Sequence, residues 1–73
     1  MKYFSDCLAK LIKDKGITQK ELYTELNLGR NQLHFWVIGK AEPDLESLKK
    51  IAQYFDVTID FLLGLEDEFG GKV

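Results

Sequence analysis

The chain has 73 residues, of which 45% are hydrophobic and 30% are charged. This balance is typical of one globular domain rather than a disordered tail, although the length is near the lower limit at which an apolar core offsets chain entropy unaided. The longest stretch without charge, residues 31–39, is too short to cross a bilayer, and the first residues lack the pattern of a signal peptide. We therefore expect a cytoplasmic protein that does not associate with a membrane.

Charge is distributed unevenly along the chain, although the net charge is only -2. Residues 1–41 carry seven Lys or Arg against four acids, whereas residues 42–68 carry two Lys against eight acids. A net negative charge disfavours a polyanion as partner, but the first part by itself is basic. The first part is therefore suited to face phosphate groups.

Cys7 is the single cysteine and His34 the single histidine of the chain. A disulfide within the chain is thus excluded, and one Cys with one His does not make a conventional structural zinc site. No pattern combines a nucleophile with a base and an orienting group. We therefore expect no enzyme, no metal, no cofactor and no small-molecule ligand, and we interpret Cys7 as a small packing residue.

Helix signals begin at the N-terminus, and strand signals are absent. Apolar residues at helical spacing predict a first helix that is capped at Ser5 and stopped at Gly16. A second helix is predicted over 19–26, because Thr18 and Glu21 have the spacing of a capping box.

A tight bend follows the second helix. Asn27 tolerates a positive φ, and Gly29 serves as the cap of a third helix, 30–38, which Gly39 stops. Two helices joined by a bend of about four residues have the geometry of a helix-turn-helix, in which the second helix lies in the major groove of DNA.

Two more helices complete the predicted all-α, five-helix fold. Asp44 caps a fourth helix over 45–55, whose apolar face is expected to include Leu45, and Thr58 caps a short fifth helix that ends near Gly64. We expect residues 1–65 to form one DNA-binding domain. Residues 66–73, acidic and then Gly-Gly, are predicted to be a frayed tail.

The third predicted helix has two different faces. Leu33, Trp36 and Val37 recur at i, i+3 and i+4 and are expected to be buried. The other side offers side chains that suit base edges, because Arg pairs with guanine, Asn and Gln pair with adenine, and an apolar group meets the thymine methyl. These candidates are Arg30, Asn31, Gln32, His34 and Phe35.

In these motifs the chain resembles the Cro and phage-repressor type of helix-turn-helix regulators, the lambda-repressor-like or xenobiotic-response-element family. The resemblance covers about residues 5–64 and rests on five segments in order: GITQKEL at 16–22, LGRNQL at 28–33, WVIGKAEP at 36–43, LKKIA at 48–52 and VTIDFL at 57–62. It implies a five-helix domain. It also implies that Gln19 and Lys40 lie at DNA phosphates, and that Arg30, Asn31, His34 and Phe35 lie at bases.

The chain departs from the family pattern at three places. Gly29 stands where Ser or Thr is usual, and Asn27 replaces the usual turn glycine. Val37 occupies the position of a common Glu, whose Arg partner in the first helix is replaced by Ile12. Packed apolar residues can replace a buried ion pair without loss of stability, so we expect Ile12 and Val37 to pack together.

The resulting hypothesis is a prokaryotic or phage transcriptional regulator that reads double-stranded DNA in the major groove. We expect a repressor that binds a pseudo-palindromic operator as a homodimer, because one module contacts only a few base pairs. The candidate dimer interface consists of Leu63, Leu65 and Phe69. The alternative is a protein-interaction or antitoxin-type module, because Phe35 and Ile38 are apolar residues predicted to be exposed.

Overall fold

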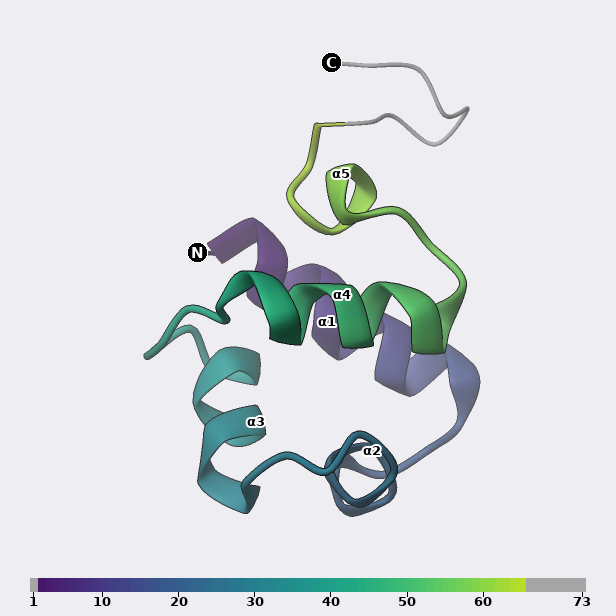
Figure 1. The fold of residues 1–73 in the computed structure, drawn as a ribbon, viewed down its shortest axis with the longest axis vertical. Helices are drawn as coiled ribbons and strands as arrows, with labels where there is room; N and C mark the ends of the chain where they lie inside the picture. The colour runs from purple at the N-terminus through teal and green to yellow at the C-terminus, as the bar shows by residue number, and fades with distance from the viewer. Residues whose placement is uncertain (1, 66–73) are drawn as a thin grey trace.

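The computed structural model describes residues 2–65. These residues form five α-helices, which confirms the predicted all-α class. Helices α1 and α4 cross the middle of the molecule, α2 and α3 lie together at one end, and α5 lies at the other end near the start of α1 (Figure 1). The helices are α1 (Lys2–Lys15), α2 (Gln19–Glu25), α3 (Arg30–Val37), α4 (Leu45–Phe55) and α5 (Ile59–Leu62).

Side-chain caps set the start of three helices, as the sequence predicts. The Thr18 hydroxyl accepts a hydrogen bond from the Glu21 N–H at 3.0 Å, the Asp44 carboxylate accepts one from the Ser47 N–H at 2.9 Å, and the Thr58 hydroxyl caps α5 in the same way. Each bond satisfies a backbone donor that has no partner within its helix. The Thr18 hydroxyl also donates to the Glu21 carboxylate at 3.4 Å.

Residues with positive φ end the first two helices. Gly16 has φ 73° after α1, and Asn27 has φ 56° after α2, as expected for residues that tolerate the left-handed region. After α4, the same conformation falls on Asp56, with φ 55°.

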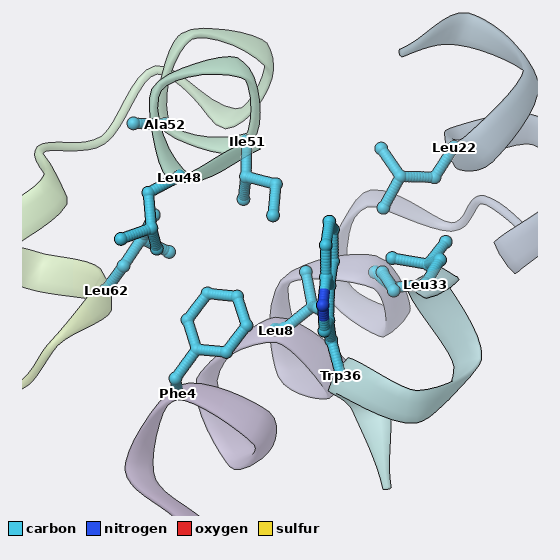
Figure 2. Packing of buried hydrophobic residues seen from close by; sticks show 10 residues of the cluster. Phe4, Leu8, Leu22, Leu33, Trp36, Leu48, Ile51, Ala52 and Leu62 are labelled. Carbon is cyan, nitrogen blue, oxygen red and sulfur yellow. The ribbon is translucent and has the colours of Figure 1, made fainter. Parts of the chain in front are cut away.

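Trp36 stands in the middle of the hydrophobic core and contacts side chains from several helices (Figure 2). Phe4 and Leu8 of α1 and Ile51 of α4 lie on one side of its indole ring, and Leu22 and Leu33 lie on the other. The indole is 2% exposed, and the other five side chains are at most 1% exposed. One aromatic side chain of α3 therefore joins the helix-turn-helix pair to α1 and α4.

The structure corrects two sequence predictions. Ser5 does not cap α1, because the helix already includes Lys2 and the Ser5 hydroxyl donates a buried hydrogen bond of 2.7 Å to the Trp36 carbonyl. A contact distant in sequence has overridden the local capping preference of serine. Leu45 does not join the core, because it is the first residue of α4 and is 59% exposed.

Apolar side chains also occupy the positions at which the family commonly has an ion pair. Ile12 is buried in the core, and Val37 packs half-buried against the same cluster. Cys7 is half-buried at the edge of the core, as expected for a packing residue, and burial raises the pKa of its thiol although Lys10 opposes this effect. Among the described helices, none has the length and apolar character needed to cross a membrane.

Candidate nucleic-acid interface

The bend between α2 and α3 spans residues 26–29 and is held by its own backbone. The Leu28 N–H donates to the Tyr23 carbonyl at 2.8 Å, and Asn27 supplies the positive φ that reverses the chain. Gly29 is the N-cap of α3 but has no side chain that could accept a hydrogen bond. The Gln32 carboxamide oxygen instead accepts a hydrogen bond from the Gly29 N–H at 3.2 Å. The bend is therefore built by residues 26–29 and their near neighbours in the sequence.

The two faces of α3 differ as predicted, except that Val37 is half-buried rather than buried. Leu33 and Trp36 are buried, whereas the polar candidates on the other side are all exposed. Phe35 is 39% exposed, and Ile38, directly after the helix, is 49% exposed. The exposed polar residues are Arg30, Asn31, Gln32 and His34.

A shallow hollow of about 550 Å³ lies between α2 and α3. It brings together four predicted site residues, Gln19, Arg30, Asn31 and His34. Gln19 is the first residue of α2 and is half-buried. None of the residues that line the hollow is an acid, which suits a surface that approaches phosphate.

Three other predicted site residues lie outside this hollow. Gln32 uses its carboxamide oxygen in the cap of α3, so that only its amino group is left as a donor toward a base. The Lys40 ammonium lies 5.9 Å from the centre of the Phe35 ring, which is within the range of a cation–π contact. The structure thus places Phe35 and Lys40 together at the carboxyl end of α3.

Lys20 and Tyr23 also line the hollow, and the sequence reasoning did not name them. The helical period could have identified Tyr23, because it follows Gln19 at i+4 and therefore lies on the same face of α2. Tyr23 is half-buried and packs against the core, while Lys20 is exposed.

The candidate dimer residues lie near the other end of the molecule. Leu63 is half-buried and packs against the core, and Leu65 is 49% exposed. Phe69 lies outside the described residues.

Comparisons with known proteins agree with the helix-turn-helix fold. The family described as Helix-turn-helix matches residues 8–62. A crystal structure of a transcriptional regulator from Listeria innocua has a TM-score of 0.79 and 31% sequence identity, and the match covers 89% of this chain and 61% of that one. The chain belongs to the helix-turn-helix family of Cro and phage-repressor type.

Relatives of this chain are transcriptional regulators by name. The HTH-type transcriptional activator BcrR of Enterococcus faecalis is 41% identical over 88% of this chain and 31% of the relative. The HTH-type transcriptional regulator ImmR of Bacillus subtilis is 39% identical over 78% of this chain and 44% of the relative. The prophage-derived HTH-type transcriptional regulator YonR of Bacillus subtilis is 38% identical over 82% of this chain and 56% of the relative. The chain thus spans between a third and a little over half of the length of these relatives.

Proposed function

We propose that the chain is the DNA-binding unit of a transcriptional regulator and that α3 reads base edges in the major groove. The observation that carries the proposal is the position of Arg30 and Asn31, which are exposed in the first turn of α3 beside a hollow without acids. Arg and Asn make the paired hydrogen bonds that distinguish guanine and adenine. Gln19 and Lys40 contact phosphates on either side, and Gln32, His34 and Phe35 complete the reading surface.

Selection of bound sequences from a random duplex pool tests the proposal. We expect a preferred duplex to emerge, and the logarithm of its affinity to fall with the logarithm of salt concentration by roughly 0.9 for each phosphate neutralised. Arg30→Ala should cost about 1 to 3 kcal/mol on the preferred duplex and little on a scrambled one. An unselective pool with no salt dependence would refute the proposal.

Binding as a homodimer on a pseudo-palindromic operator extends the proposal. Two half-sites about 34 Å apart would supply the affinity and specificity that one short reading helix lacks. Leu65 is exposed on the side of the described domain where we place the interface with Leu63 and Phe69. Leu65→Glu should therefore abolish cooperative occupation of two half-sites while leaving binding to a single half-site unchanged in an electrophoretic mobility assay.

Repression is the regulatory outcome that we propose, because occupancy of DNA is sufficient to exclude polymerase from an overlapping promoter. In vitro transcription with the selected duplex placed over or upstream of a promoter tests this step. Repression only in the overlapping position is the expected result. Stimulation from the upstream position would instead make the chain an activator, which is how the Enterococcus faecalis relative is named.

A protein-interaction or antitoxin-type module remains the second candidate, and a specific observation favours it. Phe35 and Ile38 expose apolar surface next to each other at the carboxyl end of α3. Exposed apolar patches of this kind often contact proteins. If this candidate is correct, Ile38→Ser should abolish partner binding that depends little on salt, while Arg30→Ala should leave it intact.

A further inference from the structure

The hollow between α2 and α3 contains two side chains that the reading surface of α3 does not require. Lys20 and Tyr23 both project from α2, whereas the other lining residues are the four already assigned to DNA contacts. The complete lining consists of Gln19, Lys20, Tyr23, Arg30, Asn31 and His34.

The chemistry of this lining favours an anion. Lys20 and Arg30 bring two positive charges, and the remaining four residues are neutral groups that donate hydrogen bonds. A carboxylate that would compete for an anion is not part of the lining. A phosphodiester combines one negative charge with several acceptor oxygens, and both properties match the hollow.

Tyr23 is an anchored side chain of the hollow. Its ring packs half-buried against the core, whereas Lys20, Arg30, Asn31 and His34 are exposed. Its carbonyl also accepts the 2.8 Å hydrogen bond from Leu28 that closes the bend. A hydroxyl on an anchored ring loses little conformational freedom when it donates a hydrogen bond, so Tyr23 is well suited to bind a ligand at this position.

We propose that the hollow binds one DNA phosphate, to which Lys20 supplies charge and the Tyr23 hydroxyl donates a hydrogen bond. This inference rests on the proposed function, because α3 in the major groove brings the hollow over the strand that borders that groove. The phosphate contact does not read sequence. It sets the depth and register at which Arg30 and Asn31 meet the bases.

Lys20 has a second environment that the test must separate from the first. On the other side of α2 it lines a groove of about 430 Å³ together with Glu21, Glu25 and Tyr54. The two carboxylates attract the Lys20 ammonium away from DNA. Tyr23 does not line that groove, so a loss of affinity on replacing Tyr23 can be assigned to the hollow alone.

Fluorescence anisotropy with the selected duplex and with a scrambled duplex tests the inference at several salt concentrations. Tyr23→Phe keeps the ring and its packing and removes only the hydroxyl. We expect it to weaken binding to both duplexes about tenfold, as one lost hydrogen bond to a charged group would, with an unchanged salt slope. Lys20→Gln should reduce the salt slope by about one for each subunit.

Matched controls are available on α4. Tyr54→Phe makes the same chemical change at another half-buried tyrosine, and Lys49→Gln removes an exposed positive charge that does not line the hollow. Both controls should bind like the unmodified chain. Thermal unfolding of all four variants shows whether any loss of affinity reflects unfolding.

The outcomes separate this inference from the function on which it rests. If the unmodified chain binds DNA and both Tyr23→Phe and Lys20→Gln bind like their controls, the phosphate site is wrong and the proposed function stands. A loss confined to the selected duplex also overturns the phosphate site, because it would make Tyr23 a reader of bases. Failure of the unmodified chain to bind any duplex overturns both.

Single neutral methylphosphonates in the selected duplex locate the phosphate. One position in each half-site should weaken binding of the unmodified chain but have no further effect on the variant that combines Tyr23→Phe with Lys20→Gln. If every position weakens both proteins equally, no phosphate occupies the hollow.

Discussion

The two faces of α3 differ sharply in burial. Trp36 and Leu33 on the inner face are at most 2% exposed and connect α3 to the rest of the domain. Arg30 and Asn31 on the outer face are exposed and have no part in the core. A short helix can therefore be fixed in position by one face while the other varies with the DNA sequence to be read. Stability and DNA affinity should respond to different substitutions in the same eight residues.

Trp36→Ala should give the largest effect, because it removes the side chain at the centre of the core. We expect a loss of about 4 kcal/mol in the free energy of unfolding, measured by urea denaturation. The matched change on the outer face, His34→Ala, should alter stability by no more than about 0.5 kcal/mol. Similar losses for the two variants would show that the faces are not distinct.

Val37→Glu should give the next largest effect, because it places a carboxylate against the core without a positive partner. Val37 is half-buried, so we expect a loss of about 2 kcal/mol in the free energy of unfolding. Adding Ile12→Arg restores the ion pair common in the family and should recover part of the loss. If the loss of stability in the double variant equals the sum of the losses in the two single variants, the two positions are not in contact.

Phe35→Ala tests whether the apolar part of the outer face contacts DNA. Stability should be nearly unchanged, while the affinity for a duplex with thymine at the contacted position falls by about 1 kcal/mol. Replacing that thymine with uracil removes only the methyl group, and should weaken binding of the unmodified chain but not of the variant. Indifference of the unmodified chain to uracil would favour the protein-interaction role of this surface.

Acidification should give the smallest effect and should act on α4 rather than on α3. Hydrogen bonds from Ser47, first from its hydroxyl and then from its backbone N–H, lower the pKa of Asp44. The pKa is lower in the folded than in the unfolded chain, so this contribution to stability is present above the ordinary aspartate range. It is lost as the pH falls through the folded pKa.

Asp44→Asn keeps a capping side chain that does not titrate. The difference in Tm between the unmodified chain and this variant should therefore change as the pH falls below the aspartate range. Gly29 and Gln32 cap α3 without an ionisable group, so the α3 cap should not contribute to this change. A difference in Tm that is independent of pH would contradict the role of the Asp44 carboxylate.

Local sequence signals determined the five helices and the bend between α2 and α3. Caps such as Thr18 and turn residues such as Asn27 act within four residues of themselves, so their effects can be predicted without the fold. The same holds for the division of α3 into two faces, because the helical period sets which side chains lie together. The fold class and the exposed face of α3 could therefore be predicted from the sequence.

Tertiary structure alone decided the features that depend on contacts distant in the sequence. Ser5 has the chemistry of a cap, but its hydroxyl donates to Trp36, 31 residues away. Leu45 has the chemistry of a core residue, but at the start of α4 it is 59% exposed. The hollow that brings Lys20 and Tyr23 to Arg30 exists only because α2 packs against α3. The helical period within one helix does not tell how a second helix packs against it.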